Sequence, residues 1–342
     1  MNLTSGKLNI VIDGQFGSTG KGLLCSYVGS MNHIDLSITN SSPNAGHTFY
    51  YNDKKYVFKH LPVTSITNKR SSIYLCAGSI INPDILLDEI NRYDIDPERI
   101  HIHPRAAIIT EDDIQYEHSG SCVKLSSTQN GVGKALSRKI NRESGLAMSC
   151  DTISHMVREL DVSWYLDKGC TALMELPQGL DLSLISGLVY PYCTSREITP
   201  AQALSDTQLH PSYMGKSIVC LRTYPIRVGN LIQDGKEVGY SGPFYDDSME
   251  LTWSELGMKP EYTTNTNRIR RIATFSMLQY RKMLKCLHPD YIMLNFSNYM
   301  TDKELCSLLE KLPEITHLGF SPSLDDVITR SYYEDNKILS SL

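Results

Sequence analysis

The chain has 342 residues, of which 41% are hydrophobic and 21% are charged, and its formal net charge is −5. These values are typical of a globular protein and argue against a general nucleic-acid-binding or membrane-binding surface. The nine cysteines include no CxxC pair, so we expect reduced thiols and a cytoplasmic protein. The sequence predicts neither a secretion leader nor a transmembrane segment.

Apolar runs predict strands over residues 7–13, 35–40, 72–79, 99–104, 171–177, 218–228, 291–297 and 315–320. Helical patterning predicts helices over residues 21–31, 82–93, 151–160, 267–287 and 301–312. Because strands and helices alternate, we expect an α/β fold. Its central sheet would be mostly parallel with helices on both faces, in one domain over residues 1–342. Ligands of such sheets bind at the carboxyl ends of strands, so the loops that follow strands are candidate sites.

The loop after the first predicted strand reads DGQFGSTGKG, residues 13–22. Its glycines let the backbone approach an anion, and the helix that follows points amide donors at that anion. Lys21 adds a positive charge. The spacing departs from the Walker A pattern, because five residues separate Gly14 from Gly20, and Gly22 stands where that pattern has a hydroxyl. The sequence therefore predicts a phosphate loop of another kind.

A second loop, SSPNAGHTF over residues 41–49, follows the strand predicted at 35–40. Asn44 offers amide donors and Gly46 allows a close backbone approach. His47 is a candidate proton donor or acceptor near neutral pH. This loop is therefore a candidate for acid–base chemistry.

Together the two loops resemble those of the adenylosuccinate synthetase family, which read GDEGKG and NAGHT. Other motifs resemble the family's in the same order: SSTQNGVGKALSRKINR (126–142), ELPQGLDL (175–182), GLVYPYCTS (187–195), RVGN (227–230) with SGPF (241–244), and TTNTNRIRR (263–271). The resemblance implies an adenylosuccinate-synthetase-like variant of the P-loop architecture. The family joins aspartate to the 6-position of a purine nucleotide. A nucleoside triphosphate first phosphorylates O6, and the aspartate amine then displaces phosphate.

The resemblance implies roles for the matching residues. The catalytic residues would be Ser18, His47 as the acid at O6, and Lys21, which would hold the γ-phosphoryl group. The triphosphate site would comprise Ser18, Thr19, Gly20, Lys21, Gly22, Gly46, His47, Thr48, Asn295, Ser297, Gly319 and Ser321. The acceptor nucleotide would contact Ser18, Asn44, Ala45, Ser127, Thr128, Arg142, Gln178, Thr194 and Arg268. Aspartate would contact Thr264, Asn265, Thr266, Arg268 and Arg270.

Two further implications concern partners of the site. Mg²⁺ would be bound by the Gly46 carbonyl and by phosphate oxygens, and Ser18 is a further candidate ligand. In the family, the residue at the position of Arg142 reaches the acceptor phosphate from the neighbouring subunit, so a homodimer is expected.

The sequence departs from the family at Ser18, where the family has a catalytic Asp that accepts the N1 proton and binds Mg²⁺. A serine hydroxyl replaces neither function well, and loss of a general base typically costs about 10²–10⁴-fold in rate. A small Ser also leaves room beside position 2 of the purine, and its hydroxyl can accept a hydrogen bond from an amino group there. Ser18 therefore suggests guanine as the acceptor base. The acceptor of the N1 proton stays open between Ser18, a water molecule and the γ-phosphate.

A second departure is LNFS, residues 294–297, where the family has TKLD. The family's Asp accepts hydrogen bonds from the guanine of GTP, but this chain has Asn295 and Ser297 in place of Lys and Asp. Without the carboxylate, discrimination in favour of guanine is lost. Asn and Ser can pair with adenine, so we expect ATP or dATP as the phosphoryl donor.

Both departures suggest that guanine is the base of the acceptor and not of the donor, as in a phage branch of the family that converts dGMP and aspartate to a precursor of diaminopurine DNA. The host cytoplasm would then be the location. One alternative is a conventional adenylosuccinate synthetase that uses IMP and GTP. Another is a non-catalytic nucleotide-binding regulator, which the joint presence of Lys21, His47 and Arg268 argues against.

Overall fold

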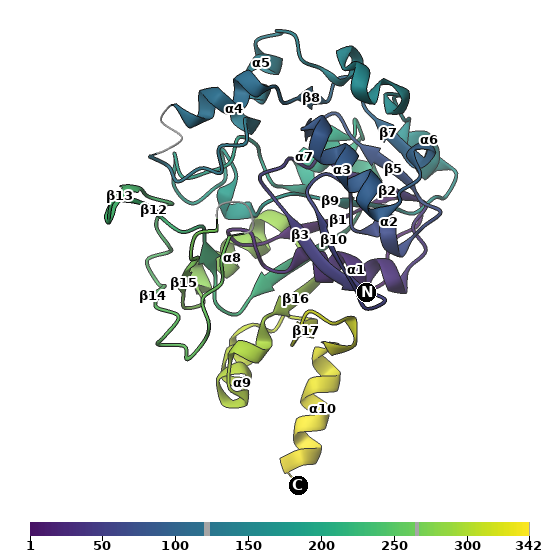
Figure 1. The fold of residues 1–342 in the computed structure, drawn as a ribbon. Coiled ribbons are helices and arrows are strands. Elements are labelled where there is room, and N and C mark those ends of the chain that lie inside the picture. The colour runs from purple at the N-terminus through teal and green to yellow at the C-terminus, as the bar shows by residue number, and fades with distance from the viewer. Residues whose placement is uncertain (120–123, 264–266, 342) are drawn as a thin grey trace.

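The computed structural model describes residues 1–119, 124–263 and 267–341. Its described strands include a nine-stranded sheet that runs through the centre of the molecule (Figure 1). In sheet order the strands are β18 (Val327–Thr329), β17 (His317–Gly319), β16 (Tyr291–Asn295), β10 (Met214–Arg222), β1 (Leu8–Asp13), β9 (Ala172–Glu175), β2 (Leu36–Thr39), β5 (Ser72–Leu75) and β7 (Ile100–Ile102).

The sheet is parallel except at one edge, which confirms the predicted α/β architecture. Strand β1 pairs in parallel with β10 on one side and with β9 on the other. Among the described strands of this sheet, only the edge strand β18 runs antiparallel to its neighbour, β17. The carboxyl ends of β1, β9, β10 and β16 therefore meet at one edge of the sheet.

Helices cover both faces of the sheet. The α-helices are α1 (Lys21–Met31), α2 (Thr64–Thr67), α3 (Pro83–Tyr93), α4 (Glu111–His118), α5 (Val132–Ile140), α6 (Val162–Asp167), α7 (Pro200–Asp206), α8 (Met277–Leu287), α9 (Asp302–Lys311) and α10 (Arg330–Ser341). Apolar side chains of α1, α2 and α3 pack on one face, and those of α6, α7, α8 and α9 pack on the other.

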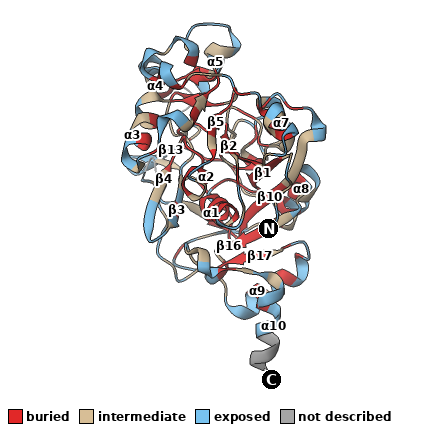
Figure 2. Cartoon of the chain, turned by 90° about the vertical axis from the view of Figure 1, so that its right-hand side faces the viewer, coloured by how far each residue is buried: buried red, intermediate tan, exposed pale blue. Residues whose placement is uncertain are grey.

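Strand β1 shows why these two cores form. Leu8, Ile10 and Ile12 pack into one apolar cluster, whereas Val11 packs into the other, because successive strand side chains point to opposite faces. All four side chains are fully buried, and buried residues are concentrated in this central layer (Figure 2). Burial of one such side chain stabilises the fold by about 1.5–3 kcal/mol.

Smaller elements surround the central sheet. The additional strands are β3 (His47–Tyr51) with β4 (Lys54–Phe58), β6 (Ile80–Ile81) with β8 (Ala107–Ile108), β12 (Leu231–Gln233) with β13 (Lys236–Gly239), and β11 (Ile226–Arg227), β15 (Arg271–Ala273) and β14 (Glu250–Leu251) in a three-stranded sheet. The 3₁₀ helices are η1 (Pro97–Arg99), η2 (Ala147–Ser149), η3 (Asp151–Met156), η4 (Leu180–Leu182), η5 (Pro211–Tyr213), η6 (Ser297–Tyr299) and η7 (Leu324–Asp326).

Two predicted helices are wrong in part. Residues 151–160 form only the 3₁₀ helix η3, because the chain then turns extended: Val157 pairs with Ile102, and the Arg158 amide donates to the Ile102 carbonyl. Residues 267–287 form β15 and then α8, which begins only after Ser276 caps it through the Gln279 amide. Pairing of β15 with β11 and β14 overrides the helical pattern of its first residues.

The predicted strand over 218–228 is also interrupted, since β10 ends at Arg222 and β11 begins at Ile226, after Pro225. None of the helices in the described residues combines the length and apolarity that a membrane-spanning segment needs. The described cysteines all have free thiols.

Candidate active site

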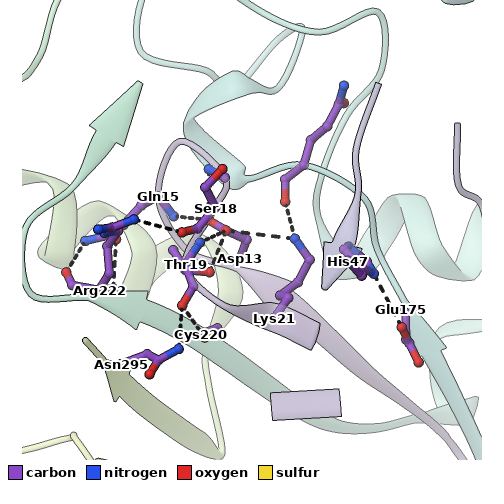
Figure 3. Close-up of polar contacts among 12 residues, drawn as sticks. Asp13, Gln15, Ser18, Thr19, Lys21, His47, Glu175, Cys220, Arg222 and Asn295 are labelled. Atoms are coloured by element: carbon purple, nitrogen blue, oxygen red, sulfur yellow. Dashed lines mark hydrogen bonds and ion pairs between the residues drawn. The ribbon is translucent and has the colours of Figure 1, made fainter. Parts of the chain in front are cut away.

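Four neighbouring strands deliver polar side chains to the same edge of the sheet. Asp13 ends β1, Arg222 ends β10, Asn295 ends β16 and Glu175 ends β9. Figure 3 shows these side chains around the loop that joins β1 to α1. The site therefore forms where parallel α/β sheets generally bind ligands.

Asp13 lies beneath this loop and shapes it. Its Oδ1 accepts hydrogen bonds from the amides of Gln15 at 2.9 Å and Gly17 at 3.1 Å. Its Oδ2 accepts from the Thr19 hydroxyl at 2.6 Å and the Thr19 amide at 3.2 Å. The Asp13 side chain is fully buried. A buried carboxylate thus satisfies three loop amides and fixes the turn around residue 18.

The loop closes against the end of β16 and then enters α1. Gly20 has φ = 86°, and a Cβ there would lie 2.0 Å from Nδ2 of Asn295, so this position requires glycine. Lys21 begins α1 and is 95% buried. Its Nζ donates to the Gln178 carbonyl at 2.7 Å and lies 3.8 Å from Oδ2 of Asp13. The ammonium group is therefore held at the cavity wall beside the α1 amides.

Ser18 is exposed at the crest of the loop with φ = 58°. Its Oγ accepts a hydrogen bond from Nη1 of Arg270 at 2.7 Å, and its carbonyl accepts from Nη1 of Arg222 at 3.1 Å. Arg222 is fully buried, pairs with Glu261 at 2.7 Å and stacks with its Cζ 3.9 Å from the Phe296 ring centroid. Two arginines therefore fix the position of Ser18 from different sides.

His47 begins β3 and faces Glu175, with 3.6 Å between its Nδ1 and Oε2 of the carboxylate. The other ring nitrogen, Nε2, is buried without a hydrogen-bond partner. Burial lowers the pKa of His47 and Lys21 also lowers it, although Glu175 opposes the shift. Glu175 is itself anchored, since its Oε1 accepts from the Thr64 amide at 3.1 Å. A neutral imidazole thus stands beside a buried carboxylate and Lys21.

These loops surround a cavity of about 570 Å³. The predicted site residues that line it are Ser18, Gly20, Lys21, Gly22, Asn44, Ala45, Gly46, His47, Thr48, Ser127, Thr128, Gln178, Thr194, Arg268 and Arg270. The structure therefore brings most of the predicted site together, although these residues come from segments far apart in the sequence.

Side chains on the wall opposite the phosphate loop are tied to one another. The Thr128 hydroxyl donates to Oδ1 of Asn44 at 2.6 Å, and Nδ2 of Asn130 donates to the same oxygen at 3.1 Å. Arg268 reaches this wall, because its Nη2 donates to the Ser127 carbonyl at 3.2 Å. Burial lowers the pKa of Arg268. Its guanidinium nevertheless remains cationic at neutral pH.

The cavity is positively charged although the chain is acidic overall. Its described wall carries Lys21 and three arginines, Arg227, Arg268 and Arg270, against the carboxylates of Glu117 and Glu261. A cavity with this balance suits anionic ligands such as nucleotide phosphates and carboxylates.

Several predicted residues lie elsewhere. Arg142 follows α5 and is exposed, outside the cavity wall. Thr19 is buried, and its hydroxyl points beneath the loop and donates to Asp13. Thr264, Asn265 and Thr266 lie outside the described residues, so their predicted contact with aspartate stays a prediction.

Four residues predicted for the triphosphate site, Asn295, Ser297, Gly319 and Ser321, do not line the cavity. Nδ2 of Asn295 donates to the Thr19 carbonyl at 3.1 Å, and Oγ of Ser297 donates to the Leu294 carbonyl at 3.0 Å. Gly319 is buried at the end of β17, and Ser321 donates to Asp326. Their contact with a nucleotide base stays a prediction, whereas Phe296 does reach the cavity wall.

Sequence reasoning missed six charged residues of the site, namely Asp13, Glu117, Glu175, Arg222, Arg227 and Glu261. Glu175 and Arg227 stand inside the motifs ELPQGLDL and RVGN, so a signal was present for both. Arg222 sits within an apolar strand pattern, and an ionisable residue in such a pattern is the signal that could have marked it. Asp13 is the first residue of the loop DGQFGSTGKG, so a signal was present for it too. Glu117 and Glu261 gave no signal that distinguishes them from other helix and loop residues.

A family model described as adenylosuccinate synthetase matches residues 10–162. A protein of Acinetobacter phage SH-Ab 15497, named N6-succino-2-amino-2'-deoxyadenylate synthase, is 34% identical, and the match covers 94% of this chain and 93% of that protein. The chain belongs to the adenylosuccinate synthetase family. The motifs that follow the strands of the central sheet are thus those of this family.

Solved structures of this family share the fold. The cyanophage S-2L succinoaminodeoxyadenylate synthetase (PurZ), solved with dGMP and with dATP as an energy donor, superposes with a TM-score of 0.84 at 33% identity and covers 94% of this chain and 95% of its own. The fully ligated adenylosuccinate synthetase of Plasmodium falciparum superposes with a TM-score of 0.79 at 17% identity, covering 95% of this chain and 100% of its own. The second comparison concerns the fold alone.

Proposed function

We propose that this protein is a ligase that joins L-aspartate to the 6-position of dGMP, with ATP or dATP as the phosphoryl donor and a 6-phosphoryl intermediate. Residues 1–342 act as one catalytic domain. The observation that carries the proposal is Ser18, a neutral residue exposed in the cavity beside His47 and Lys21. The similarity to the phage synthases over 94% of the chain supports the same substrate pair.

The phosphate loop positions the donor. The amides at the start of α1 and the Lys21 ammonium face the cavity, and they neutralise charge on the γ-phosphoryl group. Lys21 has three hydrogens, of which one goes to the Gln178 carbonyl, so hydrogens remain for phosphate oxygens. When no nucleotide is bound, the Asp13 carboxylate beneath the loop compensates the positive charge of Lys21.

His47 assists the departure of O6. The free imidazole is neutral because burial lowers its pKa, but Glu175 stabilises the protonated form. Negative charge that develops on the O6-phosphoryl group adds to this stabilisation. Nε2 has no hydrogen-bond partner among the described residues, so its hydrogen can be donated to the substrate.

The family and the reaction imply Mg²⁺. Only some of the oxygen atoms near the phosphate loop are available to bind it, because others already accept hydrogen bonds from the protein. The Gly46 carbonyl is at the cavity wall and suits a hard cation. Oγ of Ser18 accepts from the Arg270 guanidinium, and both oxygens of Asp13 are used by the loop. We therefore expect Mg²⁺ to be held by donor phosphates and Gly46, with Ser18 only if Arg270 moves. When bound, Mg²⁺ would neutralise phosphate charge.

Aspartate and a second subunit complete the site. Arg268 and Arg270 line the cavity, and a guanidinium binds a carboxylate through two parallel hydrogen bonds. Arg142 is exposed, and Ile140, two residues before it, has 70% of its surface exposed. An exposed apolar side chain beside a cation supports a homodimer in which Arg142 reaches the partner's dGMP site.

A substrate panel tests the function. Purified protein is incubated with Mg²⁺, aspartate and each pairing of dGMP or IMP with ATP, dATP or GTP, and phosphate release is measured. We expect release with dGMP and an adenine triphosphate. Turnover of IMP with GTP but not of dGMP would establish the conventional adenylosuccinate synthetase activity instead. Nucleotide binding without phosphate release would indicate a regulator.

A further inference from the structure

Ser18 cannot both recognise the 2-amino group of guanine and take the N1 proton. A serine oxygen has two lone pairs. Arg270 Nη1 occupies one of them with a hydrogen bond of 2.7 Å. Under the proposed function, on which this inference rests, the 2-amino group occupies the other. The N1 proton therefore needs a different acceptor.

The described cavity wall offers two carboxylates, Glu117 and Glu261. Both oxygens of Glu117 are used by amides at the start of α5, with distances of 2.8 Å to Gly131 and 2.8 Å to Gly133. No hydrogen bond or ion pair in the described structure joins Glu117 to the phosphate loop. This carboxylate serves as a cap of α5.

Glu261 is placed differently. Nη1 of Arg222 donates both to the Ser18 carbonyl, at 3.1 Å, and to Oε2 of Glu261, at 3.3 Å, so one nitrogen holds the carboxylate beside residue 18. The Arg270 amide also donates to the Glu261 carbonyl at 2.8 Å. The Glu261 side chain retains 24% of its exposed surface and lines the cavity.

The two oxygens of this carboxylate are not equally occupied. Oε1 accepts short hydrogen bonds from Arg222 Nη2 at 2.7 Å and from the Tyr299 hydroxyl at 2.9 Å. Among the described contacts, Oε2 has only the longer one with Arg222, which leaves it a lone pair. We propose that Glu261 accepts the N1 proton of dGMP, directly or through one water molecule, while Ser18 reads the 2-amino group.

Loss of the N1 proton is coupled to phosphoryl transfer. The N1–H bond breaks, and its electron pair forms the N1=C6 double bond. The C6=O6 π pair moves to O6, which attacks the γ-phosphorus as ADP leaves with the electrons of the P–O bond. The proton resides on Glu261 and passes to water when the product leaves. Burial would raise the pKa of Glu261, but Arg222, Tyr299 and Arg270 hold it below its usual value, so the carboxylate is ionised at neutral pH.

Positional isotope exchange in ATP isolates this step, because it needs dGMP but no aspartate. Oxygen-18 in the β–γ bridge scrambles only if the 6-phosphoryl intermediate forms and reverts. Glu261→Gln should keep dGMP and ATP binding by calorimetry but slow exchange by about 10²–10⁴-fold, with dGMP and with dIMP. Ser18→Ala should lower the preference for dGMP over dIMP. Glu334→Gln, the matched control at a carboxylate that pairs with Arg330 outside the cavity wall, should exchange at the wild-type rate.

A pH profile separates a proton acceptor from a structural partner of Arg222. Tyr299→Phe removes one hydrogen bond to Oε1, so it should raise the Glu261 pKa and move the acidic limb of the exchange rate to higher pH. The charged groups around Glu261, Arg222 and Arg270, stay unchanged. Exchange by Glu261→Gln at the wild-type rate, or an unmoved limb in Tyr299→Phe, would overturn the assignment. A wild-type protein that exchanges with IMP and GTP but not with dGMP would instead overturn the proposed function.

Discussion

The substitution Asp13→Asn tests whether a buried carboxylate shapes the phosphate loop. Asn keeps one acceptor oxygen, which can still serve the amides of Gln15 and Gly17. Its NH₂ group then faces the Thr19 amide, where donor meets donor, and the Thr19 hydroxyl loses the carboxylate oxygen to which it donates. Lys21, which is 95% buried, also loses its countercharge at 3.8 Å.

The expected loss in the free energy of unfolding of Asp13→Asn follows from these contacts. Removal of one partner from a buried ion pair typically costs about 3–5 kcal/mol, because the other charge stays buried without compensation. Each lost hydrogen bond to a charged group is worth about 1.5–3 kcal/mol, so the two bonds to Thr19 alone give a similar figure. We expect the free energy of unfolding to fall by about 3–5 kcal/mol and the KM for ATP to rise.

Urea unfolding and initial rates at varied ATP measure the two effects. Asp290→Asn is the matched control, because Asp290 pairs with Lys216 at 2.8 Å but about a third of each side chain is exposed, so its loss should cost less than about 1 kcal/mol. If both variants lost the same stability, or if Asp13→Asn kept the wild-type KM for ATP, the account of the loop would be refuted.

Three further predictions follow from the same region and from the core. Gly20→Ala places a Cβ 2.0 Å from Asn295 Nδ2 and should lower turnover by about 100-fold, whereas Gly235→Ala, also at positive φ but with no atom within 4 Å, should leave turnover near wild type. Ser18→Asp should lower the dGMP-to-IMP ratio of kcat/KM at least about tenfold, and an unchanged ratio would contradict the role of Ser18. Burial lowers the pKa of His60 to about 3, from 6.5, so the unfolded chain binds a proton in that window that the folded chain does not. The free energy of unfolding should therefore fall as pH falls through this window, by up to about 1.4 kcal/mol per pH unit, and His60→Gln should flatten the slope measured by urea unfolding at several pH values.

The sequence was informative where function depends on local backbone geometry. The loop around Lys21 and the loop around His47 follow strands directly, and their glycines signal close approach to an anion. The structure places both loops on one cavity. Strand alternation with helices was likewise sufficient for the mostly parallel sheet.

The electrostatic framework of the site could not be read from the sequence. Arg222 and Glu261 form an ion pair although they are 39 residues apart in the sequence. Arg222 also donates to the Ser18 carbonyl, from which it is 204 residues away in the sequence. Such contacts depend on which strands become neighbours, and no local pattern encodes that order. The same reason explains the strand β15, whose residues look helical but pair with β11 and β14.

The contact between Gly20 and Asn295 has a consequence for anyone who wishes to redesign this protein. The amide of Asn295 fills the space that a side chain at position 20 would need, and it also holds the Thr19 carbonyl. A larger residue introduced at 295 to alter the choice of energy source would press directly on the loop at Thr19 and Gly20. Changes of donor preference should therefore be sought as paired substitutions at 295 and in the adjoining crest, selected together from one library.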